Sequence, residues 1–282
     1  MMIRMDSNVV RRLGMQCVGW SALGVVLLLG GVRRSEAQAI TLRIRPHLGD
    51  TLRMKMEQRV EICGDSADKD VPMIKASMQV YTRAVVEKAT ATGTELVSIT
   101  DSVRVAPMAA TVVPLFAQTK RALEGKTVHL KVALDGGISI EGSPTDAKLA
   151  AVQLPALLPD GPVTPGTEWT RDLVVPVSAT HASTGVVHVT LRLDSIAPDG
   201  VVAYLSMHGT FSHTHPQQTE GGPRDATTGT ISGTIEIDRR LEWMTDSHIL
   251  VSLLSTVRQP GEAEPTRVHM KVTQSMRAMP RM

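Results

Sequence analysis

The sequence has 282 residues, of which 42% are hydrophobic and only 2% aromatic, and its formal net charge is +2. This length suits one large or two modest hydrophobic cores, which Val, Leu, Ile, Met and Ala must fill. A charge so near zero gives no electrostatic reason to expect a nucleic acid or an anionic membrane surface as the partner.

Residues 1–39 have the order of a secretory signal peptide. Three arginines precede an apolar run of 15 residues, 18–32, and a small-x-small site follows at 37–39. The run is shorter than the roughly 20 residues that cross a bilayer as a helix. We therefore predict cleavage after this site and a secreted or periplasmic protein. Arg33 and Arg34, which stand between the run and the site, leave an uncleaved anchor as the alternative.

The chain that remains after cleavage, 40–282, is nearly neutral, with 25 basic and 26 acidic residues. It keeps a single cysteine, Cys63, so no disulfide forms within it even in an oxidising compartment. The stability of this chain must come from its core.

Apolar and polar residues alternate with period two along much of the chain, which is typical of strands with one buried face. The pattern is clearest in residues 52–62, 128–134, 187–193 and 267–276. Such strands favour antiparallel sheets with one solvated face. We predict a mainly β fold of the curved-sheet or half-barrel type.

Two segments depart from this alternation. Residues 144–154 begin with Pro144 after a serine that can cap a helix, and they predict a short helix. Residues 113–125 are a second helix candidate, which ends at Gly125.

A run rich in proline and glycine divides the chain near its middle. Residues 155–166 contain four prolines and two glycines. They predict an N-terminal β half (40–158), a linker (159–166) and a C-terminal β half (167–282).

The two halves present strands and turns in the same order. The offsets between three matched pairs of turns are 117, 107 and 103 residues, for the pairs 49 and 166, 93 and 200, and 136 and 239. This order predicts a diverged duplication. The other explanation is that alternating β sequences resemble one another by default.

The leader, the GDTL at 49–52, the run from Leu158 to Trp169 and the β-rich remainder resemble a family of uncharacterised secreted bacterial proteins, described as a domain of unknown function. More distantly, the layout is similar to the half-barrel folds of lipoprotein trafficking, which carry acyl chains. The resemblance implies export and a β architecture. It transfers no catalytic residue.

The run HGTFSHTHPQQ holds His208, His213 and His215 within eight residues. If this run continues one strand, His213 and His215 share a face and His208 takes the other, unless a bulge at Gly209 reverses the parity. Zinc needs three or four ligands, and the nearby carboxylates fall in a loop predicted for 216–229. His213 and His215 are therefore weak metal candidates, and we predict no metal, no cofactor and no catalytic residue.

Other runs resemble known functional motifs but lack the further residues that those motifs require. Ser66 to Lys69 fits S-x-x-K but has no companion motifs. The acidic run 65–70 lacks the spacing of a calcium loop, and Gly125 to Thr127 lacks the first glycine of a phosphate-binding loop. Cys63 has no histidine near it in sequence, which indicates an isolated cysteine.

The Met, Leu and Val residues on the inner faces of the strands are core by default. A sharper hypothesis is that two curved sheets enclose a cavity, in which flexible Met side chains line a pocket for acyl chains or other apolar ligands. We therefore predict an exported, non-enzymatic binding module for an apolar or lipid-like ligand. The alternatives are a structural or protein-interaction module of the cell envelope with filled cores, and a metal-dependent hydrolase centred on His213 and His215. The expected partner is an apolar small molecule or an envelope protein, with no nucleic acid and no membrane span after cleavage.

Overall fold

The computed structural model describes residues 39–64, 74–107, 117, 120–141, 156–176, 184–214, 224–258 and 266–280. Residues 37–282 form one compact unit. Within the described residues, this unit is an eleven-stranded sheet. The strands are β1 (Thr51–Gly64), β2 (Ile74–Ala89), β3 (Gly93–Pro107), β4 (Thr127–Ala133), β5 (Ile138–Glu141), β6 (Glu168–Pro176), β7 (Thr184–Ile196), β8 (Val202–Thr214), β9 (Arg224–Asp238), β10 (Trp243–Arg258) and β11 (Thr266–Ala278).

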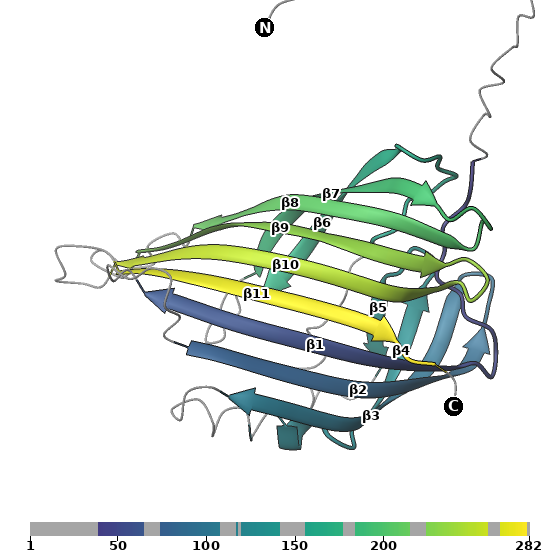
Figure 1. Ribbon diagram of the computed structural model, residues 1–282, viewed down its shortest axis with the longest axis horizontal. Helices are drawn as coiled ribbons and strands as arrows, with labels where there is room; N and C mark the ends of the chain where they lie inside the picture. Colours follow the sequence, from purple (N-terminus) through teal and green to yellow (C-terminus); the bar gives the residue numbers. More distant parts are fainter. Residues whose placement is uncertain are drawn as a thin grey trace, which may run out of the picture. The chain divides into compact units, whose positions relative to one another are not determined.

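Every pair of neighbouring strands is antiparallel, and the order across the sheet is β5-β4-β3-β2-β1-β11-β10-β9-β8-β7-β6. Two meanders, β1 to β5 and β6 to β11, therefore join where β1 pairs with β11 (Figure 1). The sheet is open, with β5 and β6 at its edges. The predicted fold class, a mainly β antiparallel protein, is confirmed. The hypothesis of two curved sheets around a cavity is wrong, because the described strands pair into one sheet.

The sheet curves, and Figure 1 shows β4, β5 and β6 behind its central strands. The inner side of the curve is the face that carries Leu52, Leu191 and Ile235, all of them buried; we call it the inner face. Glycine permits close packing on this face. Gly233 on β9 lies between Met207 on β8 and Ile249 on β10, so a residue without a side chain separates two large side chains.

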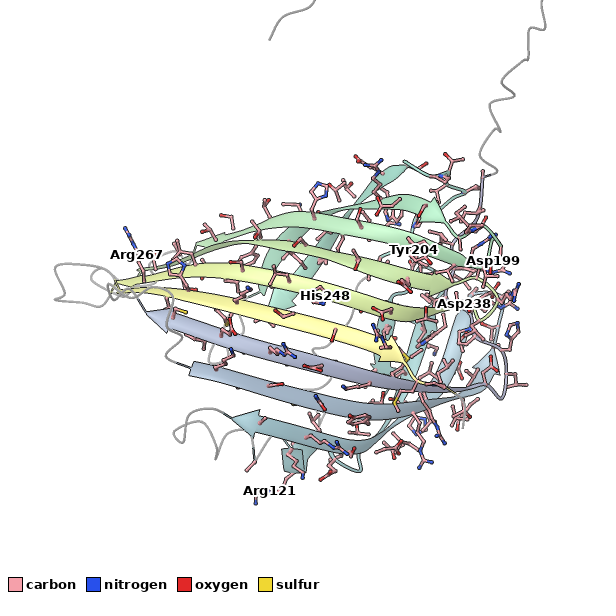
Figure 2. The ribbon with its side chains drawn as sticks, viewed as in Figure 1. Arg121, Asp199, Tyr204, Asp238, His248 and Arg267 are labelled. Carbon is pink, nitrogen blue, oxygen red and sulfur yellow. The ribbon has the colours of Figure 1, made fainter. Side chains whose placement is uncertain are left out.

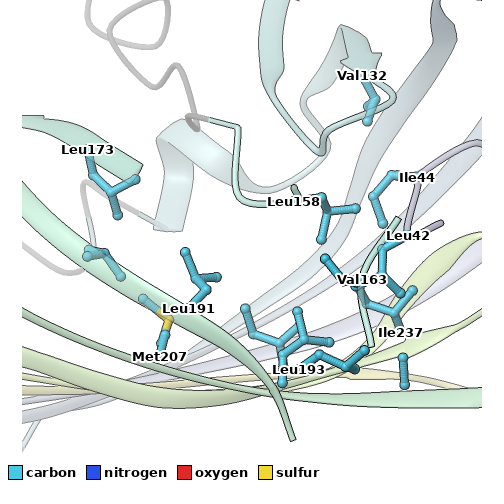
Figure 3. Close-up of a cluster of buried hydrophobic side chains, with 14 of the residues drawn as sticks. Leu42, Ile44, Val132, Leu158, Val163, Leu173, Leu191, Leu193, Met207 and Ile237 are labelled. Atoms are coloured by element: carbon cyan, nitrogen blue, oxygen red, sulfur yellow. The ribbon is translucent and has the colours of Figure 1, made fainter. Parts of the chain in front are cut away.

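The core fills one end of the inner face and extends along β6, β7 and β8 to Leu173, Val187 and Phe211. Residues 40–46 and 156–166 cross this end and pair with each other, since Ile40 and Val163 exchange two backbone hydrogen bonds of 2.8 Å. Figure 3 shows side chains of these segments, such as Leu42 and Val163, gathered beside Leu193 and Ile237 of the sheet. Leu193 is fully buried. We call this end of the inner face the packed end.

The outer face is polar, as Figure 2 shows for the side chains that line the central strands. Cross-strand ion pairs join its charges, for example Arg277 Nε to Asp246 Oδ2 at 2.7 Å and Lys75 Nζ to Glu61 Oε1 at 3.1 Å. Exposed pairs of this kind contribute little to stability. They do show that the predicted division of the strands into apolar and polar faces is correct.

The hairpins β2–β3 and β7–β8 share local features. Each ladder shifts register just before its turn, after Val86 in one and after Leu193 in the other. In each half a glycine N–H donates to the carbonyl of that residue, Gly49 to Val86 at 3.0 Å and Gly166 to Leu193 at 2.6 Å. These positions are related by the offsets of 117 and 107 residues found in the sequence. The duplication itself stays a prediction.

The second predicted helix is present as a helical turn at residues 120–123, and Gly125 follows it with a φ of 74°. The first, 144–154, lies outside the described residues. The loop predicted for 216–229 is too long, because β9 already begins at Arg224 and pairs with β8 and β10 along this stretch. The threonines of this stretch are β-branched, which suits a strand. Gly229 lies between the large side chains of Phe211 on β8 and Leu253 on β10. Within the described part of the chain, no helix has the length and apolarity of a membrane-spanning segment.

Candidate functional site

The inner face continues beyond the core as an apolar surface that is only half-buried. On β1, the alternate positions that include the buried Leu52 and Met54 continue to Gly64. The residues of β2, β10 and β11 that pair with these positions lie on the same face. Between the ladder levels of Met56 and Ile62, eight described apolar side chains at these positions are half-buried and belong neither to the core cluster nor to the residues packed against it. We call them the inner patch: Met56, Val60, Ile62, Met78, Val251, Met270, Val272 and Met276.

The members of the inner patch are neighbours in the ladders. Met56 pairs with Met276, and Ile62 pairs with Met270. Directly opposite side chains in an antiparallel pair have Cβ atoms about 5 Å apart, so these residues form one continuous surface. From Met56 to Ile62 the surface extends about 20 Å along the strand. Half of its members are methionines, whose flexible, polarisable side chains adapt to ligands of different shape.

Among the described residues, the surface around the inner patch carries no charge. At the inner-face positions of β1, β2, β9, β10 and β11, no described side chain is Asp, Glu, Lys, Arg or His. The charged inner-face residue Arg171 lies on the edge strand β6. Its guanidinium is engaged there with the carbonyl oxygen of Leu158 and with Asp160, Nη2 to Oδ1 3.1 Å. A charged ligand group would find no counter-charge at the patch.

Two glutamines lie within the patch. Gln58 on β1 and Gln274 on β11 lie directly opposite each other and are half-buried. Gln274 Nε2 donates to the sulfur of Met56 at 3.7 Å, and thioether sulfur is a weak acceptor. Gln58 makes no side-chain hydrogen bond with a described residue. Each glutamine breaks the apolar alternation of its strand, a signal in the sequence that could have pointed to these residues.

The histidine run does not assemble a site among the described residues. The β8–β9 ladder keeps one register from Val202 to Thr214, so no bulge forms at Gly209 and residues 208 and 213 have opposite parity. His208 is exposed on the outer face. The side chain of His213 and the whole of His215 lie outside the described residues. In the part of the chain that is described, no three His, Cys, Asp or Glu residues are grouped so that they could hold a metal ion.

Cys63 is half-buried at the far end of β1, and the ladder places His269 of β11 opposite it. His269 is distant from Cys63 along the chain, so the sequence alone did not predict this pair. The two residues point to the polar outer face, apart from the inner patch. A lone thiol beside one imidazole makes no binding site by itself, and Ser66 to Lys69 lies outside the described residues.

A second outer-face pair has the appearance of a catalytic dyad. His188 Nδ1 lies 2.7 Å from Asp172 Oδ1, and Thr210 is opposite His188 on β8. The side chains of His188 and Asp172 are 73% and 65% exposed. Catalytic hydrogen bonds gain strength where water is excluded, and nothing excludes water here. The geometry gives no support for catalysis at this pair.

No family model and no curated protein matches the sequence. Among solved structures, the chain is similar to one titled "Lipid-protein interactions in lipovitellin", with a TM-score of 0.45 and 9% sequence identity. The alignment covers 83% of this chain and 25% of the other, so the chain spans about a quarter of that protein's length. The resemblance to a secreted bacterial family stays a prediction.

Proposed function

We propose that this protein binds an apolar, lipid-like ligand on the inner patch, and that it acts after export and without catalysing a reaction. The observation that carries the proposal is the patch itself: eight half-buried apolar side chains, continuous across four strands and free of charge, on the inner side of a curved sheet. The export part of the proposal is supported by the leader at residues 1–39.

Apolar side chains scattered over a surface need no explanation, but a contiguous patch does. Covering apolar surface contributes roughly 25 cal/mol for each Å² removed from water. The core already covers the packed end and the inner face of β7 and β8, where Leu191 and Leu193 are fully buried. The half-buried apolar surface of β1, β2, β10 and β11 is therefore available to stabilise a ligand.

A displacement assay with an environment-sensitive apolar dye tests the proposal. In Val272→Asp, a charge enters the centre of the patch, and we expect ligand affinity to fall at least about tenfold, since a buried charge without a partner is costly. Thr273→Asp is the matched control, because this neighbour in β11 lies on the outer face. Its affinity should stay within about twofold of the unsubstituted protein. Equal effects of the two substitutions would contradict the proposal.

The packed end also favours a second candidate, a structural or protein-interaction module of the cell envelope whose core is complete. Native mass spectrometry of protein purified from its own envelope separates the two. A co-purifying lipid supports the carrier, whereas a bare mass together with no dye binding supports the structural module.

A further inference from the structure

We propose that Gln58 and Gln274 select the ligand, and that the ligand is a lipid whose polar group is uncharged and both donates and accepts hydrogen bonds, as in a monoacylglycerol or a fatty amide. The inference rests on the proposed function and deepens it, because it assigns a specificity role to two residues of the inner face.

The position of the pair supports this role. Met56 and Met276 flank the two amides on the side of the core, and Val60 and Val272 flank them on the side of the strand ends. A ligand with its polar group at the pair could lay its chain over Val60 and Val272 toward Ile62 and Met270. The polar group would then lie deeper than the chain, close to the packed end.

The hydrogen-bonding capacity of the pair is almost unused. Each glutamine amide offers two N–H donors and a carbonyl oxygen with two lone pairs. Only one contact, from Gln274 Nε2 to the sulfur of Met56 at 3.7 Å, engages these groups with described residues. A ligand hydroxyl or amide that covers the pair satisfies the glutamines, whereas a plain hydrocarbon would leave them unpaired.

The surroundings of the pair exclude a charged head group. The outer-face neighbours Arg59 and Lys271 point away from it. At the inner-face positions of β1, β2, β10 and β11, the described side chains offer no cation that would pair with a carboxylate. Desolvation of an unpaired carboxylate among methionines and valines is costly. The pair therefore discriminates against a fatty acid as well as against a hydrocarbon.

The test compares four ligands with the same saturated chain: a monoacylglycerol, a primary fatty amide, a fatty acid and an alkane. Each displaces the apolar dye from the full chain at neutral pH. We expect the monoacylglycerol and the amide to displace it at concentrations about tenfold lower than the fatty acid or the alkane, the effect of two modest hydrogen bonds. If only one of the two displaces the dye at low concentration, the head group is assigned to that chemistry.

Substitutions then assign the preference to the pair. In Gln58→Leu with Gln274→Leu, the advantage of the neutral polar lipids over the alkane should shrink to about twofold or less, with the alkane itself unaffected. Gln79→Leu on the outer face of β2 is the matched control and should keep the preference. Gln274→Lys supplies a cation and should move the preference to the fatty acid, so the inference stays testable even if the double variant does not fold.

The outcomes separate this inference from the proposed function. If no ligand displaces the dye, the proposed function fails and the inference fails with it. If the ligands displace the dye equally well, if the fatty acid is preferred, or if the double variant keeps the original preference, the patch binds lipids but Gln58 and Gln274 do not select them.

Discussion

Replacement of Gly233 by alanine tests whether β9 and β10 are packed too closely at this inner-face position to accept a Cβ without a loss of stability. A Cβ at this position would lie 2.4 Å from the carbonyl oxygen of His248 and 3.1 Å from the Cα of Ile249. Both are backbone atoms of β10, which cannot rotate away as a side chain could. Relief requires β9 and β10 to shift by roughly 1 Å, because comfortable contacts of carbon begin near 3.5 Å.

The cost of this shift can be estimated. Overpacking of a well-packed site typically costs about 1–3 kcal/mol. Alanine also has less conformational freedom than glycine in the unfolded chain, which stabilises the folded protein by about 0.4–1 kcal/mol and offsets part of this cost. We therefore expect Gly233→Ala to lower the free energy of unfolding by about 1–2 kcal/mol. For a chain of this size the melting temperature should fall by roughly 2–8 °C.

Urea denaturation and differential scanning calorimetry measure the effect, and Gly161→Ala is the matched control. Gly161 has no other atom within 4 Å of an added Cβ. This control should change the free energy of unfolding by no more than about 0.5 kcal/mol. Equal stabilities of the two variants would refute the argument, since the strands could then separate at Gly233 without cost.

Three further predictions concern the core, one carboxylate and the leader. Leu191→Ala should cost about 2–5 kcal/mol of unfolding free energy because the side chain is fully buried, whereas Val186→Ala, at an exposed position, should cost under about 0.5 kcal/mol; similar losses would show that Leu191 is not in a packed core. The hydrogen bond from Arg59 lowers the pKa of the Glu57 carboxyl, and burial opposes it. Because the folded pKa is below the unfolded value of about 4.3, the stabilisation is present above that pH and is lost as the pH falls through the folded pKa. Glu57→Gln should thus be less stable by at most about 1 kcal/mol at pH 7, with a difference that disappears in acid, and a difference independent of pH would contradict this origin. Intact-mass analysis of the exported protein should find Ile40 at its N-terminus, and a full-length protein retained in the membrane would overturn that expectation.

The fold class could be predicted from the sequence because it depends on local order. In residues 52–62, every second side chain is apolar except Gln58, and a strand is the conformation that places alternate side chains on one face. The same rule placed His208 and residue 213 at opposite parity. The end of the predicted loop at 229 was wrong, because Thr and Gly were taken as loop residues where cross-strand pairing extends β9 back to Arg224.

Only the tertiary structure decided which strands are neighbours. Alternation is nearly the same in every amphipathic strand, so it could not predict that β1 pairs with β11, at opposite ends of the folded unit. That pairing brings Gln58 to Gln274, Cys63 to His269, and Met56 to Met276. Each residue appears in the sequence as an isolated polar, reactive or apolar position. The candidate site exists because hydrogen bonds between distant segments bring those positions together, and the physical preference for that pairing lies in the packing of the whole sheet.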